Sequence, residues 1–380
     1  MNVVIFQLNI VNPNDGGISR MSKTYFDFLA SQGYNVFFLS FSKSIGELLP
    51  KQLLITGDTR EEQHSSFNDI IDKYDINVMI YQDGISPYQN YVLQWAKSKQ
   101  VKIIDVIHST LRGMYGVDGH VSLSKIKPNI LKWGINKCVN YYFMMKYGKY
   151  YREQFELSDK VVLLSDKFRD EITYFTGWKD LSKFTAISNP LTLNPPTKIN
   201  TNKNKTVLHV ALFNEQKRQD LLLDMWKYVE NLQPDWILKI VGDGYMRPKL
   251  EAKMKTLQLK HVEFLGYQSP QPYYDEAAIF CLTSAFESFG LVLVESMAYG
   301  CVPLAFNSFE TAADIIDNGK NGFLIQPFDV RQYAKQVLKL MDDIQLRKKM
   351  AVFSVEKSKN FMIEKIMPSW VEIIDDLYKV

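Results

Sequence analysis

Two glutamates in the segment SAFESFGLVLVESMAYGCVP (residues 284–303) have a spacing that could serve chemistry. Glu287 and Glu295 bracket a Phe-Gly pair and an apolar run that is otherwise typical of buried core. We expect a strand to end just before this segment and a short helix to cover 291–299, which places Gly290 at the helix N-terminus. Free backbone N–H groups and the helix dipole favour an anion such as phosphate there.

The two carboxylates face different surroundings in this pattern. Glu295 would lie one turn inside the helix among apolar neighbours, where an unpartnered carboxylate is costly to bury. A diol such as ribose would supply two donors. Glu287 precedes the helix at the carboxyl end of a strand, where parallel α/β sheets bind their ligands. The spacing alone fits equally well an amphipathic helix with two solvated glutamates.

The elements that must position these residues form a repeating α/β pattern. Short apolar runs alternate with helical patterns such as 21–32 and 67–74, which predicts right-handed βαβ units and mostly parallel sheets. The expected strands are 3–8, 36–40, 77–81, 101–107 and 160–164, then 207–212, 236–241, 262–265, 279–283, 302–306 and 322–325. The pattern therefore predicts two Rossmann-like domains in tandem with a cleft between them.

A proline-rich, polar stretch over 189–205 is typical of an interdomain linker. We accordingly predict one Rossmann-like domain over 1–189 and a second over 190–360. Residues 361–380 have apolar positions at helical spacing and predict a terminal amphipathic helix that covers core. A chain of 380 residues is long enough for two such domains.

Composition narrows the class of protein. Hydrophobic residues at 46% and charged residues at 23% are globular values, and the formal charge of +3 is too small to argue for nucleic acid. Three separated cysteines without a CxxC pair argue for a reducing compartment and against a structural metal. The N-terminus has no signal-peptide pattern, and no apolar run reaches the roughly 18–20 residues that span a bilayer. We expect a cytoplasmic protein that can also bind peripherally at the inner face of the membrane.

Further candidate residues lie at the predicted carboxyl ends of strands. Lys217 and Arg218 open a helix after a strand, which also fits an ordinary solvated pair. Gly16 and Gly17 follow the first strand, where glycines let the backbone approach a ligand closely, although a plain βα turn has the same pattern. His108 ends the strand over 101–107, and a lone histidine there is more often structural.

These motifs resemble those of one enzyme family in order along the chain. The segment 284–303 is similar to the E-x7-E signature of family-four retaining glycosyltransferases, which have the GT-B fold. Residues 317–324 (DNGKNGFL) resemble the family's dg-x-nG-x-l element. Residues 241–244 and 262–266 match other short motifs of the family. Residues 211–223 (ALFNEQKRQDLLL) resemble its GR-x4-KG-x-dlli element. Together these motifs cover most of residues 205–330.

The resemblance implies a role for each matching residue. Glu295 would bind the donor ribose, Glu287 the transferred sugar, and Lys217 the departing diphosphate. His108 would lie beside the reacting sugar, and Arg112 would assist with acceptor or phosphate. The catalytic residues implied are Glu287, His108 and Lys217; the donor-binding residues implied are Gly16, Gly17, Lys217, Arg218, Gly242, Ser288, Phe289, Gly290, Leu291, Val292 and Glu295.

The sequence also departs from the family pattern. Leu212 occupies the position of the usual arginine and Ala211 that of the glycine, which leaves Arg218 as a candidate substitute in the diphosphate clamp. Gly242-x-Gly244 lacks the third glycine of a dinucleotide-binding loop, because Arg247 stands there. Two alternatives stay open: a nucleotide-sugar epimerase of the same fold, and a catalytically degenerate nucleotide-sugar-binding partner of another transferase.

The expected chemistry needs no metal and no cofactor. The chain has no Asp-x-Asp pair, the motif with which transferases of the other major fold hold Mn²⁺ or Mg²⁺ on the diphosphate. The resemblance implies a nucleoside diphosphate sugar, foremost a UDP-sugar, as co-substrate. The acceptor would be a surface polysaccharide of the capsule or lipopolysaccharide kind, or a lipid-linked oligosaccharide. The resemblance further implies that the domain over 1–189 binds the acceptor and the domain over 190–360 binds the nucleotide sugar. It implies as well that the C-terminal helix over 361–380 crosses back to the N-terminal domain.

A basic and aromatic stretch over 121–152 predicts a further contact. It carries seven Lys and Arg residues and no acid, interleaved with tyrosines, methionines and a tryptophan. Such a segment suits an interface with anionic lipid, which would help an enzyme that extends a lipid-linked glycan. A core-facing pair of helices with solvated lysines, or tyrosines that stack on sugar, would explain the same residues.

Overall fold

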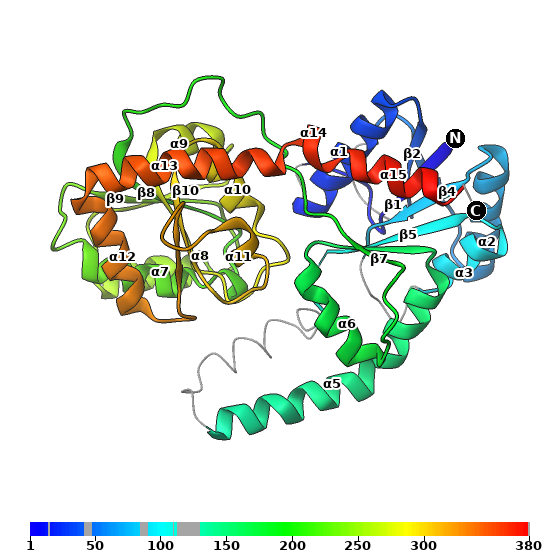
Figure 1. The fold of residues 1–380 in the computed structure, drawn as a ribbon, viewed down its shortest axis with the longest axis horizontal. Coiled ribbons are helices and arrows are strands. Elements are labelled where there is room, and N and C mark those ends of the chain that lie inside the picture. The colour runs from blue at the N-terminus through cyan, green and yellow to red at the C-terminus, as the bar shows by residue number, and fades with distance from the viewer. Residues whose placement is uncertain (14–15, 42–47, 84–89, 109, 112–129, 379–380) are drawn as a thin grey trace. The chain divides into compact units, whose positions relative to one another are not determined.

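The computed structural model describes residues 1–380 apart from 14–15, 42–47, 84–89, 109, 112–129 and 379–380 (Figure 1). Side chains are likewise not described for 130–137, 139 and 140. The chain forms two compact units. Unit 1 comprises Met1–Met114, Ile135–Thr192 and Ile363–Val380, and unit 2 comprises Tyr115–Gly134 and Leu193–Met362.

Unit 1 is built on a seven-stranded parallel sheet with the strand order β3-β2-β1-β4-β5-β6-β7. Its strands are β1 (Asn2–Phe6), β2 (Asn35–Phe41), β3 (Gln52–Ile55), β4 (Val78–Tyr81), β5 (Lys102–Ile107), β6 (Lys160–Leu163) and β7 (Phe184–Ala186). The sequence patterns did not predict β3 and β7. Both are short edge strands with partly exposed residues, so neither shows the buried apolar run that marks a central strand.

Among the described helices of unit 1, α2 (Arg60–Lys73) begins at a capping box. These helices also include α1 (Gly17–Ser31), α3 (Asn90–Ser98), α6 (Arg169–Thr176) and, from Ile135 onward, α5 (Ile130–Leu157). The prediction that a helix begins near residue 67 was wrong, because α2 starts at Arg60. Thr59 accepts a hydrogen bond from the backbone N–H of Glu62, whose side chain accepts from Thr59 in return. This capping box satisfies the first-turn donors.

The C-terminus adds two short helices to unit 1, α14 (Ile363–Ile366) and α15 (Pro368–Asp376). The single helix predicted over 361–380 is therefore broken. Pro368 has no backbone N–H to continue the helical hydrogen bonds, and it begins α15 instead. Trp370 of α15 packs on Tyr25 with ring centroids 4.4 Å apart.

Unit 2 has a six-stranded parallel sheet with the order β10-β9-β8-β11-β12-β13. Its strands are β8 (Asn204–Val210), β9 (Ile237–Val241), β10 (Val262–Gly266), β11 (Ala277–Leu282), β12 (Val302–Phe306) and β13 (Phe323–Ile325). Its helices are α7 (Gln219–Val229), α8 (Arg247–Thr256), α9 (Gln271–Glu276), α10 (Leu291–Ala298), α11 (Ala312–Ile315), α12 (Val330–Asp342) and α13 (Ile344–Ser358). The predicted Rossmann-like α/β plan is confirmed in both units.

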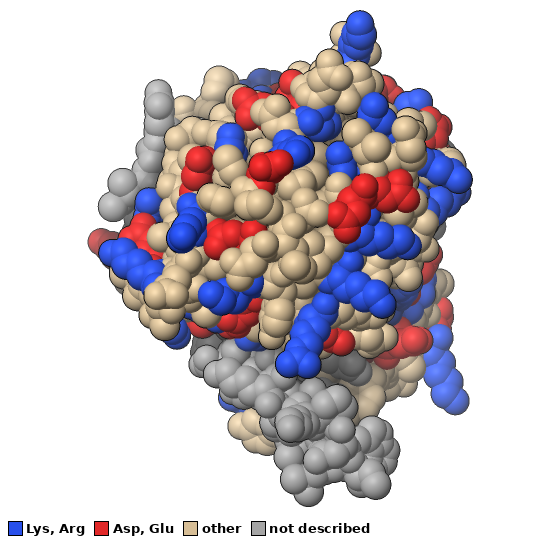
Figure 2. Space-filling model, turned by 90° about the vertical axis from the view of Figure 1, so that its left-hand side faces the viewer, with Lys and Arg blue, Asp and Glu red and all other residues tan. Residues whose placement is uncertain are grey.

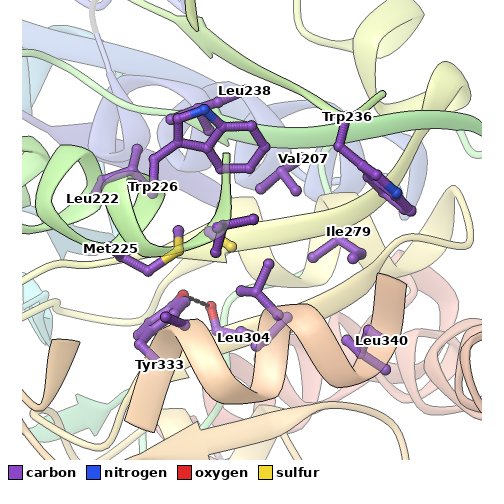
Figure 3. Packing of buried hydrophobic residues seen from close by; sticks show 14 of the residues in the cluster. Val207, Leu222, Met225, Trp226, Trp236, Leu238, Ile279, Leu304, Tyr333 and Leu340 are labelled. Atoms are coloured by element: carbon purple, nitrogen blue, oxygen red, sulfur yellow. Dashed lines mark hydrogen bonds between the residues drawn. The ribbon is translucent and has the colours of Figure 1, made fainter. Parts of the chain in front are cut away.

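The core of unit 2 lies between this sheet and the helices α7 and α12 (Figure 3). Trp226 of α7 and Tyr333 of α12 are fully buried, as are the strand residues against which they pack. The Tyr333 hydroxyl donates to the carbonyl oxygen of Leu304 in β12 at 2.6 Å. This bond satisfies the hydroxyl inside an apolar core and fixes α12 on the sheet.

On the face of the molecule in Figure 2, Lys and Arg side chains alternate with Asp and Glu side chains. That face carries no broad field of one sign. Positive and negative side chains are therefore interspersed on this surface. An anionic ligand would depend on local donors there.

Candidate functional site

The strand order of unit 2 places two loops side by side. The first strand, β8, lies between β9 and β11, so the chain leaves the sheet in opposite directions at this point. Ligands of open α/β sheets bind at such a switch point, beyond the carboxyl ends of the strands. The loop after β8 and the loop after β11 are joined there by hydrogen bonds. Ala285 N–H donates to the Gln216 carbonyl at 2.7 Å, and Thr283 Oγ1 donates to the Lys217 carbonyl at 3.0 Å.

An ion pair between Lys217 and Glu287 lies at this junction. Lys217 Nζ is 2.7 Å from Oε1 and 2.8 Å from Oε2 of Glu287. Ser284 Oγ donates a third bond to Oε1 at 2.6 Å. The two charged side chains are only 19% and 9% exposed, so water screens the pair weakly. The site thus offers one shielded cation and one carboxylate at the edge of the sheet.

The segment between the two glutamates begins α10 as the spacing indicated. Gly290 is the N-cap residue with φ 88°, a left-handed conformation that glycine adopts without strain. Phe289 is buried, and its carbonyl accepts from Thr311 Oγ1 at 2.9 Å. Ser288 and Val292 are partly exposed, and Leu291 is buried at the first helical position. The first turn of α10 therefore follows directly on the Lys217–Glu287 pair.

Glu295 has none of its surface exposed. The hydroxyl of Tyr274, in α9, donates to Glu295 Oε2 at 3.0 Å. The expectation that this buried carboxylate needs a ribose diol for its donors was wrong, because the protein itself supplies a donor. Tyr274 lies outside the quoted segment, and nothing in the local sequence pairs it with Glu295.

Arg218 is already engaged with another residue. Its Nε and Nη2 bind the two carboxylate oxygens of Asp220 at 2.9 and 3.1 Å, and its guanidinium lies 5.6 Å from the Phe328 ring centroid. Burial acts to raise the pKa of Asp220, but the hydrogen bond and charge of Arg218, with smaller effects of Lys253 and the Leu221 backbone, outweigh it and hold that pKa below its ordinary value. Leu212, where the family pattern has arginine, has a side chain that is 60% exposed.

Gly242 makes a close backbone approach. With φ 134°, it lies so near β8 that an added Cβ would be 1.9 Å from the Ala211 carbonyl oxygen. Its N–H donates to the Gly266 carbonyl at 2.8 Å. The structure thus places Gly242 where it packs the loop after β9 against the loop that leads to Lys217.

A histidine that the sequence reasoning missed lies near the ion pair. His209 in β8 is fully buried, and its Nδ1 is 2.8 Å from the Cys281 carbonyl oxygen. Because a carbonyl only accepts, Nδ1 carries the proton, while the buried Nε2 has no hydrogen-bond partner among the described residues. Burial chiefly lowers the pKa of His209 to about 4, and the charges of Lys217 and Glu287 also act on it. The sequence feature that could have revealed His209 is its position as a histidine within an otherwise apolar strand.

Unit 1 has a switch point of its own between β1 and β4. Gly16, with φ 110°, is the N-cap of α1, and both Gly16 and Gly17 are exposed. An added Cβ on Gly16 would meet no atom of the described residues within 4 Å. Its positive φ favours glycine, and the start of α1 is exposed.

His108 follows β5 and is buried, with 6% of its surface exposed. Its Nε2 is hydrogen-bonded to Oε1 of Gln82, the residue after β4. Since an amide oxygen only accepts, the proton is on Nε2. Burial lowers the pKa of His108 to about 4, so the ring is neutral near pH 7. Gln82 could have been predicted from its place at the end of a buried strand.

Two predictions fall wholly or partly outside the described residues. Arg112 lies outside the described residues, as do residues 121–129 of the 121–152 segment. In the described part of α5, Tyr141, Tyr142 and Met145 are exposed by 57%, 58% and 65%. Across the described ranges, no helix has both the length and the apolar character needed to cross a membrane.

Comparisons with known proteins agree with this architecture. Residues 194–354 match the family model described as "Glycosyl transferases group 1". An uncharacterized glycosyltransferase of Haemophilus influenzae is 32% identical over 57% of this chain and 61% of its own length. An α-1,4-N-acetyl-D-galactosaminyltransferase of Campylobacter jejuni, named for an undecaprenol-diphosphate-linked acceptor, is 26% identical over 69% and 68%. The chain thus spans about two thirds of the length of these relatives.

Solved structures share the fold over the whole chain. HepE of Anabaena, in complex with UDP, has a TM-score of 0.75 at 16% identity and covers 99% of this chain and 100% of its own. The pneumococcal O-GlcNAc transferase GtfA, with UDP and GlcNAc, has a TM-score of 0.76 at 12% identity and covers 100% and 99%. The fold is therefore of the GT-B class, and the family match lies within unit 2.

Proposed function

We propose that the chain is a retaining glycosyltransferase that moves a sugar from a nucleoside diphosphate donor to a hydroxyl of a glycan or lipid-linked acceptor. The observation that carries this proposal is the shielded Lys217–Glu287 pair directly before the N-terminus of α10. It lies inside the segment that matches the group 1 glycosyl transferase model. A cation, a carboxylate and free helix N–H groups are what a sugar diphosphate requires.

Each residue has a part in this proposal. Lys217 and the backbone amides from Ser288 to Val292, which lead into the first turn of α10, bind the diphosphate and stabilise the charge that develops as it leaves. Glu295 accepts from the ribose, and Glu287 accepts from hydroxyls of the transferred sugar. Lys217 is the cation that we assign to the phosphate, because its partner Glu287 lies directly before the N-terminus of α10, whereas Arg218 binds Asp220 at the start of α7. Gly242 packs against the loop that leads from β8 to Lys217.

The acceptor side of the reaction is assigned to unit 1. Gly16 and Gly17 present backbone at the open start of α1, and His108 is held as a neutral ring that can accept a hydrogen bond. The acceptor hydroxyl attacks on the face from which the diphosphate departs, and that leaving group takes its proton, so no enzymic nucleophile is needed. The chain has no Asp-x-Asp pair, which supports a mechanism without metal.

The names of similar proteins support a more specific substrate. HepE and GtfA were solved with UDP, and the Campylobacter jejuni relative is named for a lipid-linked acceptor. We therefore favour a UDP-sugar donor and a lipid-linked or surface-polysaccharide acceptor. The exposed aromatic residues of α5 would contact the cytoplasmic face of the membrane that carries such an acceptor.

Release of nucleoside diphosphate from a series of nucleotide sugars, with and without lipid-linked oligosaccharide, tests the function. We expect release that depends on the acceptor. Lys217→Met should abolish it, whereas Lys205→Met should not, because Lys205 forms an exposed ion pair with Asp235. A sugar interconverted without acceptor would indicate an epimerase, and binding without turnover would indicate a non-catalytic protein.

A further inference from the structure

In the proposed function, Lys217 binds the diphosphate of the donor and Glu287 binds its sugar. In the structure, these two side chains are hydrogen-bonded to each other. Lys217 Nζ directs two hydrogen bonds to the carboxylate of Glu287, at 2.7 and 2.8 Å. An ammonium has three donors, so most of the hydrogen-bonding capacity of Lys217 is used in this pair. A diphosphate that binds Lys217 therefore competes with Glu287 for the same protons.

Glu287 cannot lose Lys217 without cost. Its side chain is 9% exposed, and the remaining donor to its carboxylate among the described residues is Ser284 Oγ, at 2.6 Å. A poorly solvated carboxylate with one neutral donor is much less stable than one paired with a cation. Nucleotide binding through Lys217 is therefore weaker when Glu287 receives no other donors.

The attached sugar can supply those donors, and the spent nucleotide cannot. We propose that the Lys217–Glu287 pair discriminates between the intact donor and the nucleoside diphosphate that remains after transfer, an inference that rests on the proposed function. With the sugar present, its hydroxyls donate to Glu287 while Lys217 binds the diphosphate. After transfer, Glu287 forms its ion pair with Lys217 again, which weakens the binding of the nucleoside diphosphate product.

This role makes Glu287 a determinant of product release as well as of sugar orientation. A donor that stabilises the Glu287 carboxylate when Lys217 no longer binds it also favours diphosphate binding to Lys217. By linkage, each of these two events strengthens the other by the same factor. Removing the negative charge of Glu287 must therefore tighten the binding of the bare nucleotide. Removing the Ser284 hydroxyl makes Glu287 more dependent on Lys217 and must weaken that binding.

The test measures dissociation constants by calorimetry for UDP, GDP and ADP, each beside its glucose conjugate, on the full chain. For the nucleotide that binds, Glu287→Gln should bind the bare diphosphate at least about tenfold more tightly than the wild type. Glutamine keeps the shape and the Ser284 bond but does not compete for Lys217 as a charge. The preference of the wild type for the sugar conjugate should shrink in this variant.

Ser284→Ala is the matched variant, because it leaves both charges in place. It should bind the bare diphosphate more weakly than the wild type, so the two variants move in opposite directions. Thermal melts of both variants establish that they fold. If Glu287→Gln does not fold, the binding constant of Ser284→Ala alone tests the inference. If Glu287→Gln binds bare nucleotide equally or more weakly, or Ser284→Ala does not weaken it, the inference is overturned while the proposed function stands. If the wild type binds none of the six compounds, both are overturned.

Discussion

Among single residues, Glu295 shows how the protein holds a carboxylate in a dry environment. It is fully buried one turn into α10, and Tyr274 Oη donates to it from α9. A charged side chain in such a place depends on each of its donors, since removal of one leaves the desolvation cost uncompensated. If Glu295 also binds ribose, the ligand's hydroxyls act on the same carboxylate.

Tyr274→Phe separates these two sources of stabilisation. The variant keeps the ring packing against Phe280 and Tyr299 and removes only the hydroxyl. We expect it to lose about 1–3 kcal/mol of unfolding free energy without ligand. The increase in melting temperature on adding the preferred nucleotide sugar should then exceed that of the wild type, because ribose replaces the missing donor. An equal increase in both proteins would argue against contact between Glu295 and ribose.

His108 illustrates how a neighbour decides what a residue can do. The Gln82 oxygen fixes the proton on Nε2, and burial keeps the pKa near 4. The ring is therefore neutral and offers Nδ1 as an acceptor. It suits a contact with a sugar hydroxyl, whereas it contributes no positive charge to the departing phosphate.

Among the elements, the turn after β9 is set by a single glycine. Gly242→Ala would place a methyl group 1.9 Å from a backbone oxygen, at a φ of 134° that other residues rarely adopt. We expect a loss of more than about 4 kcal/mol in urea unfolding. Gly319→Ala is the control, because Gly319 also has a positive φ but has open space around it, and it should cost about 1–2 kcal/mol. Similar losses would mean that the approach to Ala211 relaxes easily.

The central strand β5 carries a buried acid that titrates in the neutral range. Burial chiefly raises the pKa of Asp105 to about 7, while hydrogen bonds from Gln154 and Ser158 oppose this. The folded protein thus holds a proton that the unfolded chain, with a pKa near 3.8, releases. The contribution of Asp105 to stability is therefore lost as the pH rises from about 4 to 7.

Asp105→Asn should remove that loss and keep an oxygen for the Gln154 amide, which donates to Asp105 at 2.9 Å. We expect the variant to gain stability over the wild type, and to gain about 2–3 kcal/mol more at pH 8 than at pH 5. Urea unfolding at the two pH values measures this. A gain that is the same at both would show that Asp105 is ionised in the folded protein throughout this range.

At the scale of the whole molecule, the chain builds one unit from both of its ends. Residues 363–380 belong to unit 1, where Trp370 is buried against Tyr25 and Asp375 accepts from the Tyr34 hydroxyl at 2.8 Å. Unit 2 has its own core around Trp226. The C-terminal segment is therefore part of the N-terminal unit in folding terms.

Trp370→Ala should accordingly destabilise unit 1, by about 3–5 kcal/mol. Hydrogen exchange followed by mass spectrometry should show lost protection in peptides of β1, β2 and α1 and little change in β8 and β11. Trp226→Ala is the matched change in unit 2 and should give the opposite pattern. Loss of protection throughout the chain in both variants would show that the two units unfold together.

The sequence predicts what depends on local pattern. Buried apolar runs predicted the central strands, and Gly290 marked the start of α10, because both signals lie within a few residues. The edge strands β3 and β7 carry no such run. Tyr274 and Gln82 reach their partners through the fold, across 21 and 26 positions of sequence, so spacing does not reveal them. The pairing of Lys217 with Glu287, 70 positions apart, likewise required the β8–β11 neighbourhood.

The central claim is that unit 2 binds a nucleoside diphosphate sugar through Lys217 and the start of α10. Thermal shift of the wild type and of Lys217→Met against uridine, guanosine and adenosine diphosphate sugars tests it most directly, since a bound ligand raises the melting temperature. We predict that one class, foremost the UDP-sugars, raises the melting temperature of the wild type and leaves that of Lys217→Met nearly unchanged. No shift with any of them in the wild type, or an equal shift in both proteins, would contradict the claim.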